Sequence, residues 1–246
     1  MEHPGPPTLA VSLAGLPRSR PPRAWIEWSV RAGFRGVALD ASAPGVRPRE
    51  LGAGARRDLA ALLKRQETRL AGLDLFIPPA DFVSPSRQDR AIAALTGALE
   101  LAGDLTRLGA GAACVTAELP ESLDPATRSA LAEAARSTGA RLAEARVPLP
   151  APEEDGAVIP AVDPASLILT GIDPVEALAG LPVGLAALRV SDAAGGRRVE
   201  LGAGALDVAA YRSLAVLGGA GHVVADLRGL ADAHAAARAA LGAWSG

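Results

Sequence analysis

The chain has 246 residues, which suits a single α/β domain of roughly 250 residues. Its 25 basic and 27 acidic side chains give a formal net charge of -2, and this balance excludes the strongly basic surface typical of a nucleic-acid-binding protein. Hydrophobic residues make up 49% of the chain but aromatic residues only 3%, so we expect a core of small aliphatic side chains.

The N-terminal residues lack the charged start and long apolar segment of a signal peptide. No stretch approaches the roughly 18–20 unbroken apolar residues that a membrane span needs. The single cysteine, Cys114, has no partner for an internal disulfide and lies in an apolar run, which favours a buried small side chain over a nucleophile. We therefore expect a cytoplasmic protein without membrane contacts.

Short β-rich runs alternate with longer Ala/Leu/Arg segments of helical spacing in the first half of the chain. Strands are predicted at residues 9–13, 36–40, 70–78 and 112–118. A helix that carries Trp25, Ile26, Val30 and Phe34 is predicted after Pro21-Pro22, with Gly33 and Gly36 at its end. Further helices are predicted at residues 47–67, 89–105 and 124–139.

The second half continues the alternation with one interruption. Strands are predicted at residues 140–147, 158–163, 185–190 and 222–226, and helices at residues 173–178, 207–217 and 231–244. Residues 148–156 are rich in proline and leave no room for a full helix, so the fifth helix is expected to be missing or reduced to a turn. The pattern predicts one (β/α)8 barrel domain over residues 1–246, with residues 1–7 as a flexible tail.

Acidic residues fall near the ends of many predicted strands: Asp40, Glu118, Glu144, Asp163, Asp192 and Asp226, with Asp74 nearer the middle of its strand. Side chains at the carboxyl ends of barrel strands line the active site. Acids inside apolar strands are costly unless they are paired or bound. We favour a shared pocket for Glu144, Asp163 and Asp226, although each acid could also be satisfied separately by a neighbouring arginine or backbone N–H.

Four segments carry a family resemblance: RLAE at residues 141–144, VDPAS at 162–166 with GIDP at 171–174, LRVSD at 188–192 with LGAGALD at 201–207, and GHVVAD at 221–226. In this order they resemble the xylose-isomerase-like family of sugar isomerases and epimerases. The LGAGALD segment is the most specific, and the likeness spans nearly the whole chain. It implies a (β/α)8 barrel that acts on a small sugar or polyol, in a family where homodimers are common.

The resemblance also implies a metal quartet of Glu, Asp, His and Glu, whose positions hold Glu144, Asp163, Arg189 and Asp226 here. Arginine cannot release its proton to bind a metal, and Asp226 is one methylene shorter than glutamate. Ser166 stands where the family has a substrate-binding histidine. We therefore expect no cofactor, with Glu144, Asp163 and Asp226 only weak candidates for Mn²⁺, Mg²⁺ or Zn²⁺. Arg189 is instead expected to bridge Glu144 with Asp163 or Asp226.

Two functions remain open, beside a purely structural role that has no positive feature. In the first, a sugar or sugar-phosphate isomerase or epimerase uses Glu144 and Asp226 as the proton-transfer pair. The residues expected to bind substrate are Asp163, Ser166, Arg189 and Asp192. In the second, a metal-free, non-catalytic descendant binds a small polyol or has a regulatory role.

Other residues favour structural roles. Asp192 and Asp207 are expected to cap backbone N–H groups around the LGAGALD loop, and Gly195 with Gly196 is expected to form a turn. None of the three histidines occupies a family position: His3 lies in the tail, and His222 begins a strand at the end away from the pocket. His234 lies on the last helix, where packing or solvation is expected.

Overall fold

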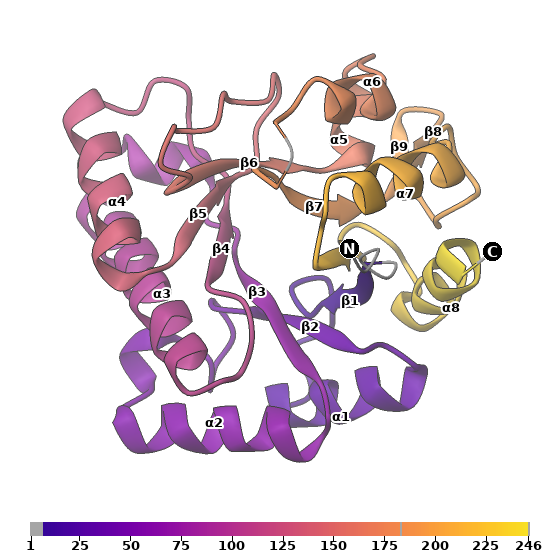
Figure 1. Cartoon of the computed structure of the whole chain (residues 1–246). Coiled ribbons are helices and arrows are strands. Elements are labelled where there is room, and N and C mark those ends of the chain that lie inside the picture. Colours follow the sequence, from indigo (N-terminus) through magenta and orange to yellow (C-terminus); the bar gives the residue numbers. More distant parts are fainter. Residues whose placement is uncertain (1–6, 183, 246) are drawn as a thin grey trace.

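The computed structural model describes residues 7–182 and 184–245. Eight parallel strands close into a barrel in the order β1-β10-β7-β6-β5-β4-β3-β2 (Figure 1). The strands are β1 (Thr8–Ser12), β2 (Gly36–Asp40), β3 (Arg69–Leu75), β4 (Cys114–Ala117), β5 (Arg141–Glu144), β6 (Val158–Val162), β7 (Ala187–Val190) and β10 (His222–Ala225). The predicted (β/α)8 barrel is therefore confirmed, and it closes despite the interruption after β5. The predicted tail lies outside the described residues as far as residue 6.

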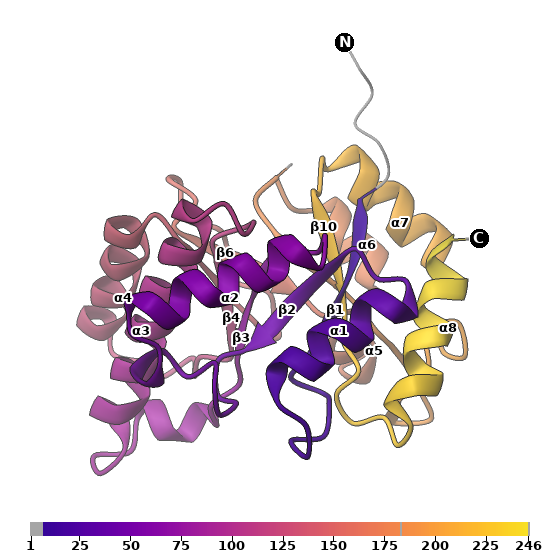
Figure 2. The ribbon, with the colours of Figure 1, turned by 90° about the horizontal axis from the view of Figure 1, so that it is seen from below.

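Helices surround the strands (Figure 2). They are α1 (Pro22–Ala32), α2 (Ala53–Arg65), α3 (Gln88–Arg107), α4 (Pro125–Thr138), α5 (Pro164–Leu169), α6 (Pro174–Ala179), α7 (Val208–Leu217) and α8 (Ala233–Ser245). Local chemistry sets several starts: Asp124 caps α4 and Asp173 caps α6, each before a proline at the first helical position. Such signals explain why most predicted helices lie within two residues of the observed ones.

The segment between β5 and β6 contains no helix in its residues 145–157, as the sequence predicted. Pro148, Pro150 and Pro152 remove backbone donors at every second position, so no helical hydrogen-bond ladder can form there. After β6 the chain forms the two short helices α5 and α6 in place of one long helix.

Two features differ from the predicted elements. The helix expected at residues 47–67 is divided into a 3₁₀ turn at Pro48–Glu50 and α2, with Gly52 between them. An antiparallel hairpin of β8 (Asp192–Ala194) and β9 (Arg197–Val199) follows β7 and was not predicted. The expected turn at its tip is confirmed, because Gly195 and Gly196 have φ values of +57° and +75°, which favour glycine.

Small side chains fill the inner face of the barrel, whereas leucines dominate the layer between strands and helices. Ala10, Ala38 and Val224 form one inner cluster, and Ala143, Ile159 and Ala161 form another. Successive strand residues alternate between the lumen and the helices, so this parity decides which side chains can reach the site.

The described residues form no helix with the length and apolar character that crossing a membrane requires.

Candidate functional site

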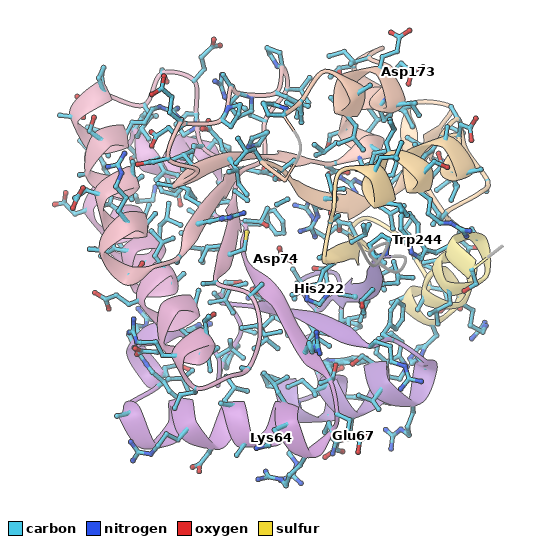
Figure 3. All side chains as sticks on the ribbon, in the orientation of Figure 1. Lys64, Glu67, Asp74, Asp173, His222 and Trp244 are labelled. Atoms are coloured by element: carbon cyan, nitrogen blue, oxygen red, sulfur yellow. The ribbon has the colours of Figure 1, made fainter. Side chains whose placement is uncertain are left out.

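Arg189 on β7 lies at the centre of the site and is only 2% exposed. Its Nη1 donates to Asp74 Oδ1 at 2.8 Å and its Nη2 to Asp74 Oδ2 at 3.3 Å. Its Nε donates to Asp226 Oδ2 at 3.1 Å. Strands β7 and β3 are opposite one another in the closed strand order, so the Arg189–Asp74 pair spans the lumen. Asp74 lies within the ring of strands (Figure 3).

A second guanidinium, that of Arg228, also pairs with Asp226. Arg228 Nη2 donates to Asp226 Oδ2 at 2.8 Å, and Arg228 Nη1 donates to Glu118 Oε1 at 3.0 Å. The Arg228 guanidinium also stacks over the Phe76 ring, 3.4 Å from its centroid. Asp226 and Glu118 are therefore both tied to one arginine at the carboxyl end of the barrel.

Asp163, directly after β6, collects hydroxyl and guanidinium donors. Ser191 donates to its Oδ1, and Ser166 donates to its Oδ2 at 2.9 Å. Arg198, from β9 of the hairpin, pairs with Asp163 and places its Nη1 3.5 Å from Asp226 Oδ2. The hairpin thus brings a third guanidinium between the two carboxylates.

These charges determine the protonation of the site. Burial on its own would raise the pKa of Asp226, but the charges of Arg189, Arg228 and Arg198 outweigh burial and hold that pKa well below its usual range. Burial would likewise lower the pKa of Arg189, but Asp226 and Asp74 raise it. Asp226 is therefore a permanent anion at neutral pH, a poor state for a group that must gain and lose a proton.

Glu144, the expected proton-transfer partner, does not join this cluster. Ala143 belongs to the inner cluster, so alternation turns Glu144 to the outer face of β5. There its buried carboxylate pairs with Arg128 of α4 and lies 2.9 Å from Arg146 Nε. The expected bridge from Arg189 to Glu144 is therefore wrong, because Arg189 reaches Asp74 instead. The bridge to Asp226 is present.

Asp192 was expected to contact substrate, but its buried carboxylate binds backbone N–H groups instead. It accepts hydrogen bonds from four backbone N–H groups, those of Ala193, Gly202, Gly204 and Leu206. This confirms the capping role proposed for it beside substrate binding. Asp207 caps the start of α7 by accepting from Ala210 N, rather than the loop itself.

The remaining candidates occupy separate positions. Asp40, at the end of β2, accepts from the backbone N–H and hydroxyl of Ser42, with Arg18 Nη2 at 3.4 Å. His234 packs at right angles against Trp28 on the outside of the barrel and accepts its Nε1–H at 2.8 Å. His222 begins β10, away from Asp226, as predicted, and His3 lies outside the described residues.

Sequence reasoning missed Arg198 and Arg228, and it gave Asp74 no role in the pocket. Arg228 follows Asp226 by two residues, and that spacing at a strand end was an available signal. Arg198 reaches the site only because the hairpin folds over the barrel, which no local pattern revealed.

A cavity of about 280 Å³ lies beside these groups. Its lining joins polar groups with apolar side chains: Pro79, Glu118, Leu119, Ala145, Arg146, Val147, Leu149, Ala161, Asp163, Ser166 and Leu167. Of the residues predicted to bind substrate, Asp163 and Ser166 therefore line the cavity.

The donors at this mouth do not fit a divalent metal. Among residues 7–182 and 184–245, no three His, Cys, Asp or Glu side chains converge in a way that could hold an ion. Asp163 and Asp226, the two carboxylates at family ligand positions, already face guanidinium groups. A divalent cation there would meet three positive charges.

Comparisons with known proteins agree with the barrel. No protein-family model matches the sequence, and no curated protein matches it. A structure of L-ribulose 3-epimerase is similar with a TM-score of 0.70 and 15% identity, covering 97% of this chain and 95% of the other. A xylose isomerase domain protein from Alicyclobacillus acidocaldarius aligns with a TM-score of 0.65 and 18% identity, over 97% and 98% of the two chains.

A xylose isomerase-like TIM barrel protein from Mycobacterium smegmatis, solved in complex with magnesium, is similar over 100% of this chain and 99% of the other, with a TM-score of 0.66 and 14% identity. Identities this low establish the shared architecture and leave activity open. The chain therefore has the xylose-isomerase-like barrel fold that its sequence motifs resemble.

Proposed function

We propose that this chain is a metal-free barrel that binds a small sugar or polyol at its carboxyl-terminal mouth without isomerising it. The observation that carries the proposal is the placement of Arg198 and Arg228 against Asp163 and Asp226. Together with Arg189, these two guanidiniums occupy the carboxylates at the family's ligand positions. Arg146, which lines the cavity, offers a guanidinium donor to ligand hydroxyls without any metal.

The lining of the cavity supports a hydroxyl-rich ligand. The Ser166 hydroxyl can donate or accept a hydrogen bond, the Asp163 carboxylate can accept one, and Glu118 offers a partly exposed carboxylate. Leu119, Leu149 and other aliphatic side chains provide an apolar surface for the C–H face of a sugar ring. A few placed polar groups on an apolar wall are typical of small-molecule sites.

The isomerase or epimerase alternative needs a proton-transfer pair on either side of a substrate carbon. Glu144 lies behind β5 with Arg128, and Asp226 stays ionised between arginines. Neither group is poised for that role, so the geometry favours binding over turnover. Sugar epimerases are among the similar structures, including those of L-ribulose 3-epimerase and D-psicose 3-epimerase, and their ketose substrates define the ligands to test.

The test is isothermal titration of chelator-treated protein with L-ribulose, D-fructose, D-tagatose and matched polyols. We expect saturable binding of at least one ligand, weakened about fivefold in Ser166→Ala through loss of a hydrogen-bonding hydroxyl. Ser137→Ala, on the exposed surface of α4, is the matched control and should bind as the parent does. Absence of binding across the panel contradicts the proposal.

A second measurement separates binding from catalysis. The same sugars are incubated with the protein in deuterated water, with and without Mn²⁺, Mg²⁺ or Zn²⁺, and exchange of the α-proton is followed by NMR. We expect no exchange in any condition. Exchange that depends on added metal would overturn the metal-free interpretation, and exchange without metal would restore the isomerase alternative.

A further inference from the structure

A second cavity, larger than the first, enters the barrel from its opposite end. Its volume is about 570 Å³, within the range of roughly 300–1,000 Å³ typical of ligand pockets. It extends from Arg141 and His222, the first residues of β5 and β10, to Asp74 and Arg189 in the lumen. The Arg189–Asp74 ion pair lines this cavity but not the smaller one, so it forms the inner end of the larger space.

Small side chains keep this part of the lumen open. Barrel interiors are ordinarily packed by layers of valine, isoleucine and leucine. Here the inner positions on four strands hold Ala38, Ala71, Cys114 and Ala187, and Gly72 adds a position without a side chain. A closely packed interior would need bulkier groups at these positions, so a bound apolar group can occupy the space that they leave.

The rim of the cavity adds further apolar surface. Leu178 and Leu181 lie at one side, at and beyond the end of α6, and Leu214 and Leu217 of α7 also line the cavity. Leu217 is 76% exposed, the most exposed of the large hydrophobic side chains in the described residues. The route from solvent into the lumen is therefore lined by aliphatic groups.

A positive charge lies at the same lip. Arg141 lines the cavity at the start of β5, is exposed, and makes one long hydrogen bond, from Nη1 to Gly184 O at 3.5 Å. Among the described residues it has no ion-pair partner, unlike Arg198 and Arg228 at the other mouth. His222 adds a buried Nδ1 that has no hydrogen-bond partner among the described residues.

We propose that this amino-terminal cavity binds a small amphiphilic carboxylate, with its apolar chain in the lumen and its carboxylate at Arg141. The apolar lining of the lumen suits the chain of the ligand, and the guanidinium at the lip suits its negative charge. The two cavities share no lining residue, so this site is separate from the sugar or polyol site and does not depend on it.

Octanoate is the first probe, with 1-octanol and octylammonium as neutral and cationic matches of equal chain length. Isothermal titration of the full chain should give saturable binding of one octanoate per chain, with 1-octanol weaker and octylammonium weaker still. Arg141→Gln should weaken octanoate about fivefold, as expected for a partly exposed ion pair, while Arg141→Lys retains most of the affinity.

Filling the lumen tests the location. Ala187→Leu and Ala71→Leu, on opposite strands β7 and β3, should each abolish octanoate binding. Ala145→Leu is the matched control because it places the same side chain in the smaller cavity at the other mouth, and it should leave octanoate binding unchanged. Having two filling variants keeps the test valid if one of them does not fold, as judged by circular dichroism.

Several outcomes would overturn the proposal: no octanoate binding, several octanoates per chain, equal affinity for the three probes, or unchanged binding in a folded lumen-filling variant. Loss of octanoate binding in Ala145→Leu alone would place the ligand at the other mouth and would also overturn it.

Discussion

Arg189 on β7 and Asp74 on β3 meet across the barrel, with 2.8 Å between Nη1 and Oδ1, and both line the larger cavity but not the smaller one. Both side chains are almost fully buried, at 2% and 1% exposure. Because Arg189 also holds Asp226, one guanidinium compensates two buried carboxylates from different strands. The site is therefore also a structural crosslink of the barrel.

Removal of this guanidinium should destabilise the fold. Arg189→Met leaves Asp74 and Asp226 without their shared partner, and breaking a buried ion pair from one side costs about 3–5 kcal/mol. The free energy of unfolding in urea at pH 7 measures the effect. Arg198→Gln is the comparison, because its side chain is 16% exposed and water can replace part of its contacts, so the loss should be smaller.

The partner carboxylate gives a further check on the same pair. Asp74→Asn in the Arg189→Met background should recover part of the lost stability, since one of the uncompensated charges is removed. Equal stability of parent and Arg189→Met would contradict the view that this arginine holds the barrel together.

Acid should unfold the protein partly through Asp226. Its folded pKa is held below the unfolded value of about 3.9, so its contribution to stability is fully present above that value and is lost as the pH falls below it. Each pH unit below about 4 should lower the free energy of unfolding by up to about 1.4 kcal/mol through this group. Urea unfolding from pH 6 to pH 2 should show a shallower acid slope in Asp226→Asn, and identical slopes would count against the pairing.

The sequence revealed the barrel because each strand and helix carries its own local signals. These signals are alternating apolar runs, proline at the first helical turn and capping aspartates. Each acts over a few residues, so each can be recognised in the sequence before the tertiary structure is known. The same locality explains the missing helix after β5, where Pro148, Pro150 and Pro152 exclude a hydrogen-bond ladder.

The site was harder to predict for two reasons. It depends on which side of its strand each side chain faces, and on contacts between segments that are far apart in the sequence. Ala143 and Ala145, the two neighbours of Glu144, pack with the inner cluster of the barrel. Because side chains alternate along a strand, the carboxylate of Glu144 faces the helix layer instead of the lumen. Arg198 is far from Asp163 in sequence and reaches it only through the hairpin of β8 and β9. Motif resemblance located Asp163 and Asp226 and the pairing of Arg189 with Asp226, but it could not reveal Arg198 and Arg228.

Cys114, half-buried beside the larger cavity, should react slowly in the folded protein. Burial raises the pKa of its thiol to about 12, and the charge of Asp74 adds to the effect. At pH 8 the folded thiol should therefore react with Ellman's reagent about a thousandfold more slowly than the urea-unfolded thiol, whose pKa is about 8.5. The chain has only one cysteine, so the absorbance change reports this thiol alone. Similar rates in the folded and unfolded protein would contradict a raised pKa for this thiol.

The loop from residue 201 to residue 207 should depend on Asp192 for its conformation. Four backbone N–H groups donate to this buried carboxylate, so Asp192→Ala leaves them without their acceptor and should cost about 2–4 kcal/mol of unfolding free energy. Gly204→Ala should also destabilise, because a Cβ there would lie 2.2 Å from Asp192 Oδ1 and 2.6 Å from Ala193 O.

Gly202→Ala is the matched control within the same loop. Its added Cβ meets nothing closer than 3.6 Å, so only the strain of a φ of +86° remains, about 1 kcal/mol. Urea unfolding of the three variants should therefore place Gly202→Ala nearest the parent. If Gly204→Ala were the mildest of the three, the carboxylate of Asp192 would not be what fixes the loop.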